Sequence, residues 1–311
     1  MTTKKRSGYV FKKNMHLTTL ALPALLLVFL FEYIPMAGIV VAFKDYNYAD
    51  GILKSPWIGF KNFEFFFKNN AFTVTRNTML YNMSFIVVGL VFSLLFAMLL
   101  NELTNRRMVK LYQTAFFFPY FFSWVIVAYM VYSFMAPNGI FPSSSLNDFF
   151  MKTTGFSLKD FYITPGIWPG FLVFLNTWKI LGYTSVLYYA AIIGISTDYY
   201  EAAEIDGASR VQRARYITFP LLLPLISIMT LLQVGQIFRA DFGLFYFVPR
   251  EISKLADATR VIDVHVYRML RLSNDIGMAA AIGVYQSVLC FILVLLANFT
   301  VKKIDPDYAA F

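Results

Sequence analysis

Polar side chains recur at helical spacing inside long apolar stretches of this 311-residue chain. The candidates are Asn77 and Tyr81 in one stretch, Asn176, Lys179 and Tyr183 in a second, and Gln233, Gln236 and Arg239 in a third. Polar groups in such surroundings are costly and usually face a cavity or another helix. Hydrogen-bond donors, acceptors and aromatic rings at one depth would suit a polyhydroxylated solute, such as a neutral or acidic sugar.

A second interpretation gives the same residues a purely structural role. Lys179, Arg239 and Asp241 could pair with one another, or extend their charged ends to the interface, and serve helix assembly alone. Spacing does not tell whether a polar stripe faces a solute or a neighbouring helix. Both interpretations therefore stay open at the level of the sequence.

The composition indicates which elements carry these side chains. Hydrophobic residues make up 58% of the chain and charged residues only 14%, whereas a soluble domain has about 25% charged residues. This nearly excludes a soluble enzyme. One cysteine and two histidines exclude an internal disulfide and a Cys/His zinc cluster. The net charge of +9 suggests basic tails beside anionic membrane lipid rather than nucleic acid.

Six stretches are long and apolar enough to cross the roughly 30 Å hydrocarbon core of a bilayer as helices. They cover residues 17–43, 77–100, 111–135, 166–195, 218–242 and 276–301. We therefore expect an all-α integral membrane protein with one transmembrane domain over 17–301, between a basic tail at 1–16 and a second tail at 302–311. Lys and Arg in short loops place both termini and the 196–220 loop in the cytoplasm. The loops near 44–76, 136–165 and 243–275 are then external.

The 196–220 loop has a strong local pattern. Asp198 is a good N-cap, and Glu201 three residues later can complete a capping box. Gly207 can take the left-handed conformation that ends a first helix. Ser209 could cap a second helix that runs until Pro220 opens the fifth span. The pattern predicts two short helices joined at a glycine, as a compact polar knob that faces the cytoplasm.

The spacing in this loop also resembles a known family motif. Glu201-Ala202-Ala203, followed by Gly207, Ile217 and Pro220, is similar to the EAA loop of the permease subunits of binding-protein-dependent ABC importers. Phe219 stands where that pattern usually has Leu, and both residues are large and apolar. The segments 33–38, 57–63 and 262–268 look like those of multiple-sugar and polysaccharide permeases.

The resemblance implies the six-helix fold of a type I ABC importer permease, in which this loop is the coupling helix that docks on a cytoplasmic ATPase. The corresponding residues here are Glu201, Ala202, Ala203, Asp206, Gly207, Arg210, Arg213, Ile217 and Pro220. Glu201 and Gly207 would hold the shape of the knob. Arg210 and Arg213 share one helix face and would contact the ATPase.

The implied assembly lies in a bacterial cytoplasmic membrane and moves a carbohydrate, such as an oligosaccharide, by alternating access. Its other parts are a second, non-identical permease, two ATPase subunits and an extracytoplasmic solute-binding protein. The chain has no G-x-x-x-x-G-K-[ST] phosphate loop, so ATP and Mg²⁺ are expected on the ATPase and no cofactor or enzymatic activity on this chain. The alternatives are a gradient-driven transporter or channel that works alone, and an ABC permease for a solute other than a sugar.

Overall fold

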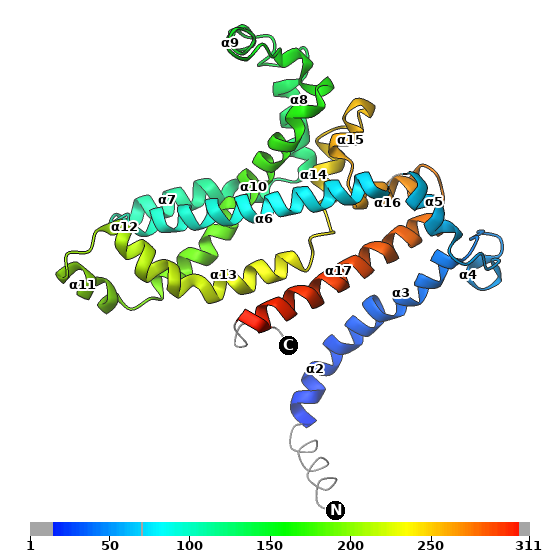
Figure 1. Cartoon of the computed structure of the whole chain (residues 1–311), viewed down its shortest axis with the longest axis horizontal. Helices are drawn as coiled ribbons and strands as arrows, with labels where there is room; N and C mark the ends of the chain where they lie inside the picture. Colours follow the sequence, from blue (N-terminus) through cyan, green and yellow to red (C-terminus); the bar gives the residue numbers. More distant parts are fainter. Residues whose placement is uncertain (1–14, 70, 305–311) are drawn as a thin grey trace, which may run out of the picture. The chain divides into compact units, whose positions relative to one another are not determined.

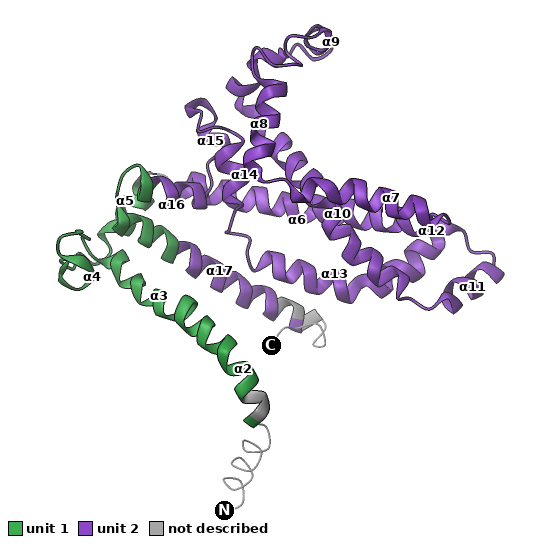
Figure 2. Ribbon diagram, turned by 180° about the vertical axis from the view of Figure 1, so that it is seen from behind, with its two compact units in different colours: residues 1–69, 269–284 green, residues 70–268, 285–311 purple. Residues whose placement is uncertain are grey.

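The structure is a computed structural model that describes residues 15–69 and 71–304. Most of the two expected tails, residues 1–14 and 305–311, lies outside these ranges. The described residues form helices, turns and one isolated antiparallel bridge between Lys44 and Trp57. They divide into two compact units, residues 1–69 with 269–284 and residues 70–268 with 285–311 (Figure 2). The all-α membrane fold class is confirmed.

Unit 1 holds the first predicted span as one long helical run. It consists of α2 (Met15–Val28), the π-helical η1 (Phe29–Tyr33), α3 (Ile34–Met36) and the 3₁₀ helix η2 (Ala37–Phe43). Two short helices follow, α4 (Gly51–Lys54) and α5 (Lys61–Asn69). The Asn62 amide donates to the carbonyls of Ala42 (3.0 Å) and Lys44 (3.1 Å) and so fixes the end of the run.

Unit 2 carries most of the remaining helices (Figure 2), which Figure 1 labels in chain order. The long ones are α6 (Ala71–Asn101), α7 (Arg106–Phe117), α8 (Trp124–Met135), α10 (Trp168–Ile193), α13 (Phe219–Val234) and α17 (Ile276–Ile304), whose first residues belong to unit 1. The short ones are η3 (Phe118–Phe121), α9 (Ser145–Thr154), η4 (Leu158–Ile163), η5 (Pro165–Ile167), α11 (Thr197–Ile205), α12 (Arg210–Arg213), η6 (Ala214–Thr218), α14 (Phe242–Phe247), η7 (Ser253–Leu255), α15 (Ala256–Thr259) and α16 (Ile262–Arg271).

Within the described ranges, four helices are long and apolar enough to cross a membrane, at Thr19–Phe43, Ala71–Asn101, Arg210–Val234 and Ile276–Phe299. Two bent pairs bring the number to six if each pair is one span: Arg106–Phe121 with Trp124–Met135, and Pro165–Ile193 with Thr197–Ile205.

Two of the expected spans need correction. The stretch at 111–135 is broken, because α7–η3 and α8 meet at 96°. Pro119 lies in the 3₁₀ turn before the break, and Ser123 N-caps α8 by accepting a hydrogen bond from the Ile126 N–H. The fifth span does not cover 218–242, because its helix begins at Arg210 and ends at Val234.

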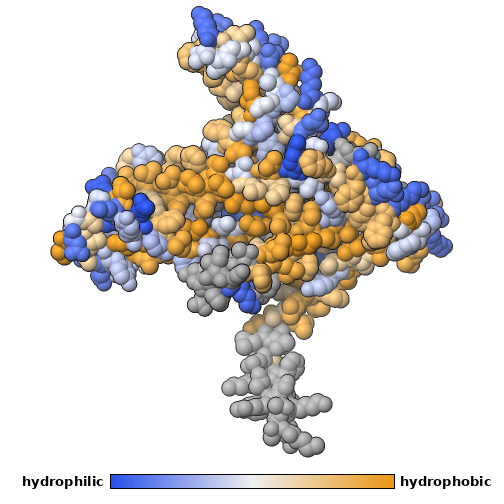
Figure 3. Space-filling view, in the orientation of Figure 1, coloured by the Kyte–Doolittle hydropathy of each residue, from blue (hydrophilic) through white to orange (hydrophobic). Residues whose placement is uncertain are grey.

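Apolar side chains of helix α6 have two kinds of surroundings. Val74, Phe85 and Ala97 are buried against neighbouring helices. Val91 and Leu99 are 47% and 65% exposed. Figure 3 shows the resulting apolar surface along α6 and α7, with hydrophilic residues gathered at the end that carries α11 and α12. An apolar surface of this length is what a lipid-facing helix requires.

The core of unit 2 is built on aromatic side chains. Trp168 at the start of α10 is fully buried, and its indole N–H donates to the Phe161 carbonyl at 3.0 Å. Phe161 and Tyr162 pack against this indole, and Phe245 of α14 lies in the same cluster. The partner for the indole N–H matters because an unpaired polar group would be costly in this buried position.

Helix α10 lies close to two neighbours. The hydroxyls of Ser93 on α6 and Thr184 on α10 share a hydrogen bond, and the α10 side chain of Ile180 reaches Gly89 of α6. A Cβ atom added to Gly182 would lie 2.3 Å from the Phe116 carbonyl oxygen on α7. Only glycine fits this contact without movement of one backbone against the other.

We expect Gly182→Ala to lower the free energy of unfolding by about 1–3 kcal/mol, because the added methyl group forces α7 away from α10. Thermal unfolding of the detergent-solubilised protein would measure the loss. Gly170→Ala is the matched control, since it lies on the same helix and its added Cβ would meet nothing within 4 Å. Equal stability of the two variants would contradict the close contact.

Candidate functional site

The fifth membrane helix ends in an irregular segment that the sequence did not predict. Helix α13 stops at Val234, and residues 235–241 run as turns before α14 begins at Phe242. Local turns satisfy some backbone groups, such as the Arg239 N–H, which donates to the Gln236 carbonyl at 2.8 Å. Irregular backbone at membrane depth is tolerated only where it is buried in protein or lines a water-filled cavity.

Three side chains from other elements satisfy four further backbone groups of this segment. The Asn82 amide of α6 donates to the carbonyls of Ile237 (2.8 Å) and Arg239 (3.1 Å). The Gln286 amide of α17 donates to the Phe238 carbonyl at 2.6 Å. The Asp263 carboxylate of α16 accepts from the Ala240 N–H at 2.7 Å and from Gln286 at 3.1 Å. The irregular segment is therefore held in one conformation from three sides.

The electrostatics of Asp263 agree with this holding role. Burial raises the pKa of its carboxyl group, whereas the hydrogen bonds from Ala240 and Gln286 and the positive charge of Arg239 oppose that shift. Each hydrogen bond to the ionised carboxylate is a charge-assisted one, stronger than a bond between neutral groups.

A cavity of about 350 Å³ lies beside the irregular segment. Four predicted pathway residues line it: Asn176 from α10, and Gln233, Gln236 and Arg239 from the end of the fifth helix. Asn82 also lines it, together with the apolar Phe85, Ile86, Ile180, Met229 and Leu232. The structure thus brings together amides from three helical elements and one guanidinium group.

Asn176 differs from the other amides in its surroundings. It is only 8% exposed, yet its side-chain amide has no hydrogen-bond partner within the part of the chain that the structure describes. Its amide lines the cavity and is therefore reached from it. A polar molecule in the cavity would find both hydrogen-bond donors and an acceptor on this amide.

The other four predicted pathway residues lie elsewhere. Asn77 donates to the carbonyls of Asp257 (2.8 Å) and Arg260 (3.0 Å), and the Tyr81 hydroxyl donates to the Ala258 carbonyl (2.7 Å). These two side chains fasten the α15 segment to α6, beside a separate hollow of about 540 Å³.

Lys179 and Tyr183 meet the break between α7 and α8. The Lys179 ammonium donates to the Tyr120 carbonyl at 3.0 Å and lies 5.2 Å from the Trp124 ring centroid. The Tyr183 ring stacks on Tyr120 with centroids 4.7 Å apart. Asn176, Lys179 and Tyr183 share one helix, but only Asn176 lines the cavity with Gln233 and Gln236.

The structural alternative for Lys179, Arg239 and Asp241 is not excluded: they form no ion pair with one another within the described ranges, but Lys179 and Asp241 both contact Trp124. Asp241 instead N-caps α14 and accepts from the Trp124 indole N–H. Arg239 takes part in none of the ion pairs found among the described residues. Arg239 lines the cavity, and its positive charge also acts on the Asp263 carboxylate.

The predicted knob at 196–220 forms two helices joined at Gly207, whose φ is +78°. This left-handed conformation is the one that favours glycine at a helix end. Ser209 caps α12, as predicted from its position. It does so in a reciprocal capping box with Gln212. The Tyr200 hydroxyl and the Thr218 hydroxyl are 2.9 Å apart and join α11 to η6.

Some details of the knob were predicted wrongly. The N-cap of α11 is Ser196, which accepts from the Asp198 N–H, so Asp198 lies inside the helix and forms no capping box with Glu201. Pro220 does not open a new helix, because α12, η6 and α13 form one helical run over Arg210–Val234. Since Pro220 has no N–H for the Tyr216 carbonyl, the wider π turn of η6 accommodates its ring.

The arginines of the knob form ion pairs within the chain. Arg213 pairs with Glu204 at 3.0 Å, and Arg210 pairs at 3.5 Å with Glu102, which follows α6. Large apolar side chains are exposed instead: Ile205 is 87% exposed, Val211 76% and Tyr199 58%. Glu201, Ala202, Asp206 and Pro220 are exposed, whereas Ala203 and Ile217 are half-buried.

Asn82 and Gln286 are the residues that the sequence analysis missed. Both are uncharged polar side chains in the middle of apolar stretches, so the rule that singled out Asn176 applies to them as well. Asp263 gave no comparable signal, because it lies in a loop already rich in charged residues.

Comparisons with known proteins identify similar chains. The sequence profile of the family described as "Binding-protein-dependent transport system inner membrane component" matches residues 89–306, more than half of the chain. Protein LplB of Bacillus subtilis is 30% identical over 299 residues, which cover 95% of this chain and 91% of that protein. The polygalacturonan/rhamnogalacturonan transport system permease protein YteP, from the same organism, is 29% identical over 98% of this chain and 94% of its own length.

A solved structure agrees in fold. The structure of a bacterial alginate ABC transporter in complex with an alginate pentasaccharide-bound periplasmic protein contains a similar chain. The TM-score is 0.82 at 27% sequence identity, over 95% of this chain and 97% of that one.

A matched pair of substitutions separates the two kinds of asparagine at this site. We expect Asn82→Leu to lower the free energy of unfolding by about 1–3 kcal/mol, because the carbonyls of Ile237 and Arg239 lose a donor. Asn176→Leu, which breaks no hydrogen bond among the described residues, should leave the unfolding temperature unchanged or higher. Thermal unfolding in detergent would measure both. The reverse order of stabilities would contradict the assigned roles.

Proposed function

We propose a transport mechanism for this chain, which belongs to the family of inner membrane components of binding-protein-dependent transport systems. The chain is a transmembrane permease subunit of an ABC importer for a carbohydrate, and it is not an enzyme. The relatives named for polygalacturonan/rhamnogalacturonan and for alginate support an oligosaccharide as the cargo.

The cavity beside the irregular end of the fifth helix is our candidate for the solute pathway. Each amide of Asn176, Gln233 and Gln236 supplies both donors and an acceptor, which is what sugar hydroxyls require. Its volume of about 350 Å³ is within the range of about 300–1,000 Å³ that is usual for small-molecule sites. The observation that carries this proposal is that the amides of Asn176, Gln233 and Gln236 line one cavity.

The 196–220 loop is our candidate for the surface that binds an ATPase subunit. Arg210 and Arg213 are occupied by Glu102 and Glu204, so we assign them to the shape of the knob rather than to the contact. Ile205 and Val211 are the most exposed large apolar side chains of the knob and would bury their surface in a groove of the ATPase. Burial of apolar surface is the main driving force of such association.

The remaining partners follow from the family. We infer a second permease subunit, two ATPase subunits that bind ATP and Mg²⁺, and an extracytoplasmic solute-binding protein. Both termini and the knob would face the cytoplasm, and the exposed apolar face of α6 would contact lipid. Continuity of the helix from Arg210 to Val234 would carry movement of the ATPase to the cavity.

Ile205→Asp should reduce co-purification of the ATPase at least tenfold. Burial of an isoleucine stabilises an interface by about 1.5–3 kcal/mol, and a buried unpaired charge would oppose association further. Arg210→Gln is the control, because an exposed ion pair contributes only about 0–1 kcal/mol. If Ile205→Asp retained the ATPase as the wild type does, the proposed contact would be wrong. Purification of this chain with no ATPase at all would favour a transporter that works alone.

Gln236→Ala should raise the half-saturating concentration for ATP-driven uptake of the oligosaccharide about two- to tenfold, as expected for one lost hydrogen bond. Uptake into proteoliposomes that contain the whole transporter would measure it. Gln113→Ala makes the same change on α7, outside the residues that line the cavity, and should have no effect. Wild-type uptake by Gln236→Ala would give that residue a structural role only.

A further inference from the structure

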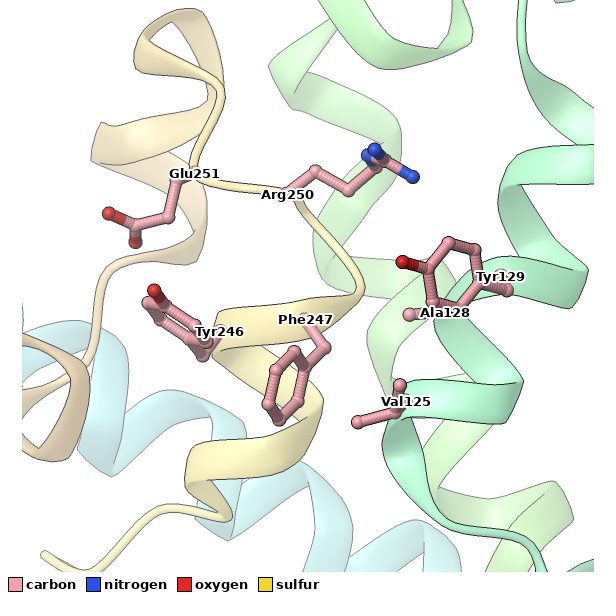
Figure 4. Close-up of a pocket in the computed structure, with 7 residues that line it drawn as sticks. All are labelled: Val125, Ala128, Tyr129, Tyr246, Phe247, Arg250 and Glu251. Atoms are coloured by element: carbon pink, nitrogen blue, oxygen red, sulfur yellow. The ribbon is translucent and has the colours of Figure 1, made fainter.

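A second pocket lies between α8 and α14, apart from the cavity described above. It has a volume of about 380 Å³ and is lined by Val125, Ala128, Tyr129, Tyr246, Phe247, Arg250 and Glu251. Figure 4 shows Tyr129 on one side of the hollow, Tyr246 and Phe247 on the other, and Arg250 across its edge. It shares no lining residue with the cavity at Asn176 and Gln236.

The walls of this pocket combine flat rings with polar groups. Tyr129 is 63% exposed, and Phe247 on the opposite wall presents a second ring. The tyrosines add hydroxyl groups, so each has an apolar body and a polar end. The C–H face of a sugar ring can pack on such a ring while its hydroxyls bind the polar groups at the rim.

The backbone at the edge of the pocket is strained. Arg250 and Glu251 are consecutive non-glycine residues with φ of 56° and 55°, in the left-handed region. Such conformations persist where the surroundings determine them, and they are frequent at ligand sites. Here the Glu251 carboxylate pairs with Arg268 at 2.7 Å, and the Arg250 guanidinium lies 3.9 Å from the Tyr132 ring centroid. These contacts hold Arg250 against an aromatic face.

The charge balance of the pocket is positive. Arg268 already neutralises Glu251. Arg250 is exposed, and it belongs to none of the ion pairs among the residues that the structure covers. A guanidinium group stacked on a ring keeps its N–H edge free for a planar, bidentate partner. A carboxylate matches that edge in geometry and charge.

We propose that this pocket is a docking site for an acidic saccharide, in which Arg250 binds the carboxylate of a uronic acid unit and Tyr129 packs against its ring. The inference rests on the proposed transport function and on the orientation that places the 243–275 loop outside the cell. The sugar would dock here before it enters the cavity, where Arg239 supplies a second positive charge.

Protection of a reporter thiol tests the site directly. Cys290 is the only cysteine, so the background variant is Cys290→Ser, and Val125→Cys places the reporter in the pocket wall. The complete transporter in proteoliposomes is treated with a membrane-impermeant maleimide in the presence of trigalacturonate or its carboxyl-reduced counterpart. These two probes differ only in whether each sugar carries a carboxylate or a hydroxymethyl group.

Trigalacturonate should slow the labelling at least fivefold, and the carboxyl-reduced sugar should require a concentration about tenfold higher or more. Arg250→Gln should remove this difference between the probes. Lys254→Gln removes one exposed positive charge from the same loop outside the pocket and should retain it. Tyr129→Ala should weaken protection by both sugars, whereas Arg250→Lys should weaken protection by the acidic sugar only.

Equal protection by the two sugars, no protection in the parent protein, or equal losses in Arg250→Gln and Lys254→Gln would each overturn the proposal. The proposal would also be overturned if the Arg250→Gln transporter bound the solute-binding protein more weakly but was still protected better by the acidic sugar than by the reduced one. ATP-driven uptake by the parent transporter is measured in the same proteoliposomes. Its absence for every oligosaccharide would count against the transport function, whereas normal uptake with unselective protection would count against this site alone.

Discussion

The structure depends on one constraint: backbone N–H and C=O groups at membrane depth must find partners within the protein, because the hydrocarbon offers none. A continuous helix supplies these partners through its own backbone. The segment at 235–241 is not helical, and Asn82 of α6, Gln286 of α17 and Asp263 of α16 form hydrogen bonds with its backbone instead. Polar residues within the apolar stretches therefore have two roles. Asn82 and Gln286 donate hydrogen bonds to the irregular backbone, whereas Asn176, Gln233 and Gln236 line the cavity beside it.

The same arrangement connects the two ends of the transport mechanism. The helical run from Arg210 to Val234 begins in the 196–220 knob and ends where Gln233 and Gln236 line the cavity. Arg210 also pairs with Glu102 beyond the end of α6, and α6 carries Asn82 to the same cavity. A displacement of the knob would therefore reach the cavity along the Arg210–Val234 run, because the exposed pair of Arg210 and Glu102 is a weak link to α6. Packing of this kind transmits movement because interiors are dense and deform little.

The knob could be predicted from the sequence because its turns and caps depend on neighbouring residues. The cavity was harder to predict because it depends on contacts between distant parts of the chain. Gly207 and Ser209 act through their own backbone and their nearest neighbours, so their roles could be read from spacing. Asp198 was misplaced because Ser196, two residues earlier, offers an equally good cap. Lys179 was grouped with Asn176 because both lie on α10, but its neighbours depend on the 96° bend at the end of α7, which helical spacing cannot reveal. The end of the fifth helix at Val234 was missed for a similar reason: its partners come from three distant parts of the chain.

The length of α6 has a consequence for the membrane in which this protein works. Its 31 residues span about 46 Å at 1.5 Å per residue, whereas the hydrocarbon core is about 30 Å thick. Helices that exceed the core by this much tilt, extend beyond it or thicken the bilayer around them. Because α6 bears Asn82 in one half and the exposed apolar Val91 and Leu99 in the other, its inclination would couple the proposed solute pathway to the surrounding lipid. Bilayer thickness would then influence the tilt of α6, and with it the position of Asn82 at the cavity.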